Sequence, residues 1–173
     1  MLASRNPNMD VISSLILTSP PTYNDMVTAI PQEELKRNYD FLKSPLFGNL
    51  AFQILESRIA IRFFSDLFLF GDEKCDEEWL DSTQEEICVE ARTPVQAFNA
   101  GLLQHRSYEE ELISIIQPTM VVSGSGDKRK VDRIQYTTYM KQCTQHTLYG
   151  VNVIPWENPK ELIELINRTV LQK

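Results

Sequence analysis

The sequence predicts an α/β fold in which a parallel β-sheet is interrupted by a long helical segment. Two apolar runs rich in β-branched residues, 11–18 and 119–123, are typical of buried parallel strands. The last third of the chain alternates strand and helix patterns, which also indicates a parallel sheet. The region between the two runs has helical spacing. At 173 residues, the chain is long enough for one compact domain or for part of a larger one.

The N-terminal residues predict the end of one helix followed directly by a core strand. Residues 1–5 read as a last helical turn, which stops at Asn6-Pro7 because proline disfavours helix in the residue before it. The strand predicted at 11–18 ends at Pro20-Pro21. A stable domain seldom begins in mid-helix, so this opening predicts that the physical domain has more chain upstream.

The middle of the chain contains several predicted helix starts. A capping residue is followed by proline at two of them, and this order favours a helix because proline fits its first position. A serine followed three residues later by a glutamate predicts a capping box at another. The predicted starts are Pro31, Ser44-Pro45, Glu77 (a helix to Val89), Thr93-Pro94 and Ser107-Tyr108-Glu109-Glu110 (a helix to Ile116).

The last third begins with the stretch from Gln117 to Asp127. Its apolar run predicts a strand at 119–123, Gly124 and Gly126 end it, and Asp127 follows. A buried parallel strand of this kind delivers a carboxylate to the edge of the sheet where ligands bind. Further on, the patterns predict a helix at 131–143, a strand at 146–149 and a helix at 159–171.

Composition excludes several classes of function. The net charge of −7 argues against a nucleic-acid partner, which requires clustered lysine and arginine. The three cysteines form no C-x-x-C pair and only two histidines are present, so we expect no metal site and no disulfide framework. The absence of disulfides favours a reducing compartment, and no cofactor is expected.

The most apolar window, 59–70, does not predict a membrane span. It contains Arg62 and Asp66, and it is shorter than the roughly 20 apolar residues that a span requires. The N-terminus is too polar for a secretory signal. The sequence therefore predicts a soluble intracellular protein.

The order of these elements, with these residues, resembles the C-terminal half of an α/β-hydrolase. Residues 117–127 are similar to the family's acid segment, P-T-apolar-apolar-x-G-x-x-D, and residues 150–159 are similar to its histidine loop with the trailing E-x-P. The resemblance implies that Asp127 takes the place of the catalytic acid. It also implies a core made of 1–21 and 113–173 and a helical cap at 22–112.

Two departures from the family pattern bear on activity. No G-x-S-x-G occurs in this chain, and by the resemblance the nucleophile elbow would fall before Met1. The family's histidine aligns with Asn152, or with Val153 under a different gap placement, and neither is a base at neutral pH. His146 lies on the wrong side of the histidine loop to replace it. The chain by itself is therefore expected to be catalytically inactive.

Each candidate residue has a structural alternative. Asp127 would orient an imidazole in a triad, or it would cap the segment that follows and pair with Lys128, Arg129 or Lys130. Asn152 would hold a substrate or water, or bond to nearby backbone. Phe64 and Phe68, with Phe63 and Phe70, would line an apolar pocket under the cap, or form the core of the helical segment. The structural alternative is favoured for Asn152 and for the phenylalanines.

Three hypotheses of function follow. In the first, the full-length protein is an ester- or amide-type hydrolase that acts on a small apolar or acyl-type substrate. In the second, it is a non-catalytic binding or scaffold protein that keeps the hydrolase fold, as the missing histidine suggests. In the third, the chain is an incomplete gene product whose sheet would have an open edge. The sequence does not indicate an oligomeric state.

Overall fold

A computed structural model describes residues 12–87, 92–102 and 107–169 of the chain. The chain divides into two compact units. Unit 1 consists of Met1–Val27 and Tyr108–Lys173, and unit 2 consists of Thr28–Ser107. The helix predicted at 1–5 lies outside the described residues, as do the first residue of the 11–18 strand, Cys88 and His105.

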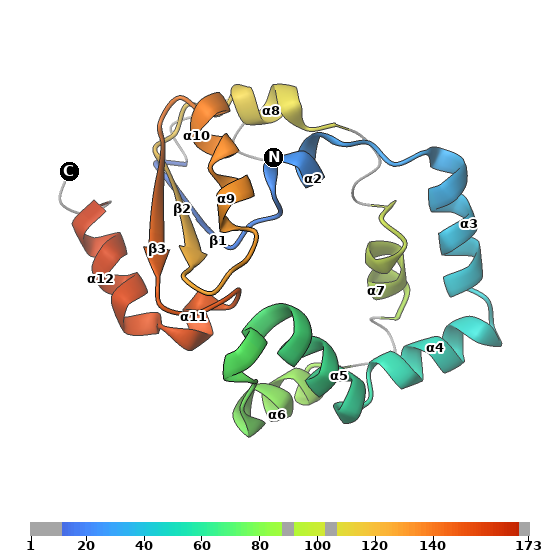
Figure 1. Ribbon diagram of the computed structural model, residues 1–173. Helices are drawn as coiled ribbons and strands as arrows, with labels where there is room; N and C mark the ends of the chain where they lie inside the picture. The colour runs from blue at the N-terminus through green and yellow to red at the C-terminus, as the bar shows by residue number, and fades with distance from the viewer. Residues whose placement is uncertain (1–11, 88–91, 103–106, 170–173) are drawn as a thin grey trace. The chain divides into compact units, whose positions relative to one another are not determined.

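Unit 1 is built on a three-stranded parallel sheet with the order β1-β2-β3 (Figure 1). The strands are β1 (Leu15–Thr18), β2 (Thr119–Gly124) and β3 (Cys143–Leu148). Leu15 lies opposite Thr119 and Thr119 lies opposite Cys143, so the three carboxyl ends meet at one edge of the sheet. Every residue of β2 is buried, which agrees with the apolar run at 120–122 in the middle of this central parallel strand.

Helices cover both faces of this sheet (Figure 1). On one face, Val121 packs with Tyr136 and with residues from α2 and α8. On the other, Met120 and Val122 pack against Ile154 and Leu162. The helices of unit 1 are α2 (Tyr23–Val27), α8 (Glu109–Ile113), α9 (Lys130–Arg133), α10 (Gln135–Tyr139), α11 (Ile154–Glu157) and α12 (Pro159–Thr169). The parallel sheet predicted from the sequence is confirmed.

Unit 2 is helical in its described residues. Ser57 caps α5 by accepting a hydrogen bond from Ala60 N, and Asp76 caps α6 by accepting one from Trp79 N at 2.7 Å. The elements are α3 (Gln32–Leu42), α4 (Phe47–Leu55), α5 (Arg58–Phe64), the π-helix η2 (Ser65–Phe70), the 3-10 helix η3 (Gly71–Glu73), α6 (Glu77–Glu85) and α7 (Arg92–Asn99).

Several predicted boundaries were wrong. The helix predicted at 131–143 is two short helices, α9 and α10, and β3 begins at Cys143 rather than at 146. α8 has Tyr108 rather than Ser107 at its N-cap position. No helix in the described part of the chain is long and apolar enough to cross a membrane.

Candidate functional site

The candidate site lies at the carboxyl edge of the sheet, where the segments after β2 and β3 meet. Ser125 N donates to Leu148 O at 2.7 Å, and Gly126 N donates to Gly150 O at 2.9 Å. Glycine is required at position 124, because a Cβ there would lie 2.2 Å from Val151 O. The structure thus places the predicted acid segment directly beside the loop that resembles the histidine loop.

Asp127 is held by two groups from the segment that follows it. Its Oδ2 forms an ion pair with Arg133 Nη1, and its Oδ1 accepts a hydrogen bond from Arg129 N at 2.8 Å. Asp127 is 3% exposed and Arg133 is 4% exposed, so the pair is withdrawn from water. Burial lowers the pKa of Arg133, yet a guanidinium remains charged at neutral pH. Asp127 is therefore one half of a buried ion pair.

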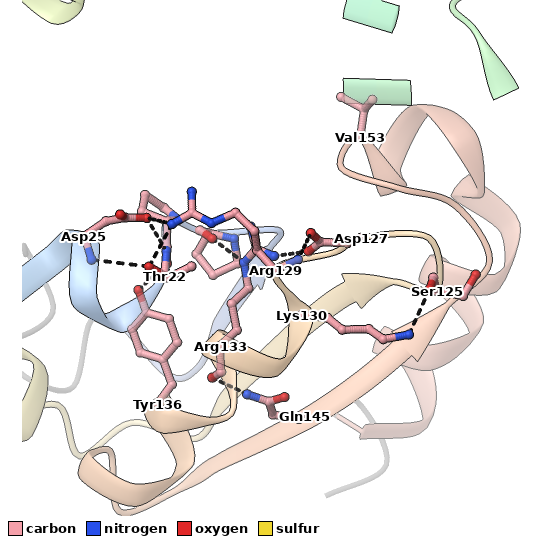
Figure 2. Close-up of polar contacts among 12 residues, drawn as sticks. Thr22, Asp25, Ser125, Asp127, Arg129, Lys130, Arg133, Tyr136, Gln145 and Val153 are labelled. Atoms are coloured by element: carbon pink, nitrogen blue, oxygen red, sulfur yellow. Dashed lines mark hydrogen bonds and ion pairs between the residues drawn. The ribbon is translucent and has the colours of Figure 1, made fainter. Parts of the chain in front are cut away.

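The same two arginines also reach the segment that leaves β1 (Figure 2). Arg129 Nη2 contacts Asp25 Oδ2 at 2.5 Å and Thr22 Oγ1 at 3.0 Å. Arg133 Nε donates to Pro20 O. Burial works to raise the pKa of Asp25, but the hydrogen bonds from Thr22 and the charge of Arg129 outweigh it and lower that pKa. The arginines fasten the end of β1 to the segment after β2.

These contacts correct one prediction and support another. The expected charged partners of Asp127 were Lys128, Arg129 or Lys130, but the ion pair is made with Arg133. Lys130 Nζ instead donates to Ser125 O at 2.8 Å. The expectation that Asp127 caps the following segment agrees with its bond to Arg129 N. Its role as a triad acid stays a prediction.

The carboxylate of Glu157 organises the loop after β3. Glu157 Oε1 accepts from Val151 N at 2.8 Å, and Oε2 accepts from Val153 N at 2.9 Å. Gly150 begins the loop at a φ of +131°, a conformation that favours glycine. The sequence indicated Glu157 only through its resemblance to the E-x-P ending. It gave no sign that this carboxylate fixes the loop.

The described histidine does not reach Asp127. His146 lies within β3 opposite Val122, and burial, then the charge of Arg168, lowers its pKa. Asn152 and Val153, which align with the family's histidine, are half-buried in the loop that Glu157 holds. Figure 2 shows Asp127 directed at the arginines, with Val153 on a separate loop. In the described part of the chain, the side chain of Asp127 bonds to Arg133 and Arg129 and not to an imidazole.

Phe64 and Phe68 belong to unit 2. Phe64 is 40% exposed, Phe68 is 60% exposed, and their rings stack with centroids 6.0 Å apart. The interpretation of these phenylalanines as packed core is wrong for both residues and for Phe63, whereas Phe70 is buried. Their role in binding a ligand stays a prediction.

Among residues 12–87, 92–102 and 107–169, no group of three His, Cys, Asp or Glu side chains is arranged to hold a metal ion. The two thiols within the described residues give no sign of activation either, since burial raises the pKa of Cys143 to about 11 and that of Cys75 above its usual range.

Comparison with known proteins gives a fold but no close relative. No family profile and no curated protein match the sequence. Solved structures do match, among them a probable hydrolytic enzyme from Pseudomonas aeruginosa (TM-score 0.66, 14% identity, 98% of this chain and 60% of that one). Another is a serine hydrolase involved in carbazole degradation, CarC (TM-score 0.65, 15% identity, 99% and 58%). A third is Est816, described as an N-acyl homoserine lactone degrading enzyme (TM-score 0.60, 18% identity, 98% and 61%).

The chain spans about three fifths of the length of these three proteins. The match nevertheless covers nearly all of this chain, including both the sheet and the helical segment. The chain therefore has a partial α/β-hydrolase-like fold.

Proposed function

We propose that this chain is the C-terminal portion of an α/β-hydrolase-like protein and that it does not itself hydrolyse esters or amides. The observation that carries the proposal is the environment of Asp127, whose two carboxylate oxygens bind Arg133 and Arg129 N. A triad acid must orient an imidazole and stabilise its charged form. In this chain, the charge that Asp127 stabilises belongs to a buried arginine.

The loop after β3 supports the same proposal. Glu157 fixes the backbone at Val151 and Val153, so the position that aligns with the family's histidine is rigidly held but carries Asn152 or Val153. Neither side chain accepts a proton at neutral pH. The loop after β3 thus keeps a fixed shape, but the position that aligns with the family's histidine carries no general base.

A chromogenic assay tests this proposal. The purified chain is expected to release p-nitrophenol from acetate and butyrate esters no faster than Asp127→Asn and Asp132→Asn variants, without a burst. Asp132 is the matched control because it is exposed on α9. Saturable turnover that is lost in Asp127→Asn but kept in Asp132→Asn would refute the proposal. A fluorophosphonate probe gives a second readout on the unmodified chain, and covalent labelling of a serine would also refute it.

For the whole protein, two functions stay open as proposals. The solved neighbours are hydrolases, which favours an ester- or amide-type hydrolase acting on a small apolar or acyl-type substrate, with 22–112 as its cap. The residues aligned with the family's histidine favour a non-catalytic binding protein. Hydrolysis by the full-length protein would support the first, and retention of an apolar ligand without turnover would support the second.

A further inference from the structure

Two serines at the carboxyl ends of the neighbouring strands β1 and β2 have buried hydroxyl groups without a hydrogen-bond partner. Ser19 directly follows β1, and Ser123 lies near the end of β2. Neither Oγ atom has a partner among the residues that the structure describes. Ser123 is 3% exposed, so solvent at the surface does not reach its hydroxyl. Buried polar groups of native proteins are nearly always hydrogen-bonded, so these two hydroxyls require an explanation.

The two serines lie side by side in the sheet. Leu17 lies opposite Val121, and both pack in the hydrophobic cluster on the α10 side of the sheet. Because side chains alternate along a strand, Ser123, two residues after Val121, points to the same side. Ser19 N donates to Val122 O at 2.8 Å, which continues the ladder between β1 and β2 by one residue. The backbone of Ser19 is therefore placed beside Ser123.

The backbone at Ser19 has an unfavourable conformation. Its φ is +42°, in the left-handed region that a residue with a Cβ rarely adopts. The next residue is Pro20, and a residue before proline normally takes an extended conformation with a negative φ. Contacts with the following residues hold this turn, since Arg133 Nε donates to Pro20 O and the hydroxyl of Tyr136 donates to Pro21 O at 2.6 Å. These contacts also fix the position from which the Ser19 side chain extends.

The polar side chains that hold this turn are engaged with other groups. Arg133 uses Nη1 for Asp127 and Nε for Pro20 O. Tyr136 uses its hydroxyl for Pro21 O. A molecule that satisfies the two serine hydroxyls has to be small, because both oxygens are closed off from the surface. Water is small enough, and it can donate to one hydroxyl and accept from the other.

We infer that a buried water molecule bridges Ser19 Oγ and Ser123 Oγ. The water joins the ends of β1 and β2, in addition to the contacts that Arg133 makes with Pro20 O and with Asp127. Buried waters that satisfy otherwise unpaired polar groups are part of a fold and are costly to remove. The bridge therefore stabilises the carboxyl edge of the sheet. It does not depend on the proposed function, which assigns no role to either serine.

A double-mutant cycle measured by urea denaturation of the full chain tests this bridge. Ser123→Ala is expected to raise the equilibrium constant of unfolding about 5-fold, the loss of an ordinary hydrogen bond. Ser19→Ala should raise the constant about 5-fold less in the Ser123→Ala background than in the unmodified chain, because the bridge is already broken there. The cost of alanine at a positive φ cancels in this comparison. Ser125→Ala, at an exposed position two residues further on, is the matched control and should leave the constant unchanged.

The opposite sign is expected if the hydroxyls have no ligand, because removing a buried, unpaired hydroxyl leaves stability unchanged or raises it. That result for Ser123→Ala, or equal effects of Ser19→Ala in both backgrounds, would overturn the inference. A crystal structure of the unmodified chain gives a second readout, in which one water is expected at about 2.8 Å from both Oγ atoms. A direct contact between the two hydroxyls, or no water density between them, would also overturn it.

Discussion

The segments after β2 and β3 meet at the same edge of the sheet, yet each uses its carboxylate differently. Asp127 neutralises a buried arginine, and through the two arginines it is linked to the end of β1. Glu157 instead accepts hydrogen bonds from two backbone N–H groups of its own loop. The first arrangement joins distant parts of the chain, whereas the second shapes one loop.

This difference shows that the carboxyl edge of the sheet is held by contacts that both carboxylates make within the chain. In this chain both carboxylates have structural partners, so the geometry of the edge does not depend on a histidine between them. The two carboxylates should therefore differ in their contribution to stability, and the first two of the following experiments measure that difference.

The largest effect is expected from breaking the buried ion pair. Asp127→Asn leaves the guanidinium of Arg133 buried without its counter-charge, and such a change costs about 3–5 kcal/mol. Urea denaturation should show this loss, while Asp132→Asn should stay within about 0.5 kcal/mol of the unmodified chain. The double variant Asp127→Leu/Arg133→Met should recover much of the stability, because it removes both charges together. An Asp127→Asn variant as stable as the unmodified chain would show that the pair has no structural role.

A smaller effect is expected in the loop after β3. Glu157→Gln removes the charge from two hydrogen bonds and can keep only one oxygen acceptor, so we expect a loss of about 1–3 kcal/mol. Hydrogen exchange should quicken at the amides of Val151 and Val153. Glu164→Gln, at an exposed site on α12, is the control. Unchanged exchange at Val151 and Val153 would contradict the role given to Glu157.

The smallest effect concerns pH and His146. Burial, together with the charge of Arg168, lowers the pKa of His146, so the folded state binds a proton less readily than the unfolded chain. Stability should therefore fall as the pH drops below the ordinary pKa of histidine, about 6.5, and the fall should level off below the folded pKa.

The loss should be below about 1 kcal/mol, because His146 is only half-buried and the charge of the exposed Arg168 is screened by salt. Urea denaturation of the unmodified chain and of His146→Gln, each at pH 7 and at pH 5, measures the part of this loss that is due to His146. An identical pH response in both proteins would show that His146 does not contribute.

Local sequence patterns were sufficient for β2 and for the position of Asp127, and they located β1 and β3 with different boundaries from those observed. The run at 119–123 and the glycines after it determine a buried strand and its end, and the structure has β2 at Thr119–Gly124. Where the pattern was weaker, as in the region 131–143, the predicted single helix was wrong. Helical spacing there does not reveal the break between α9 and α10.

The partners of the site residues were decided by the tertiary structure alone. Arg133 meets Asp127 because the chain turns back after residue 127, and Arg129 meets Thr22 across 107 positions of sequence. The contact of Arg129 with Thr22 depends on β1 and β2 being neighbours in the sheet, and no local pattern contains that information. The sequence by itself determined which segments are strands and where a carboxylate leaves the sheet. Only the folded chain decided which charge that carboxylate meets, because several cationic residues follow Asp127 and the path of the turn and of α9, not local propensity, brings Arg133 to it.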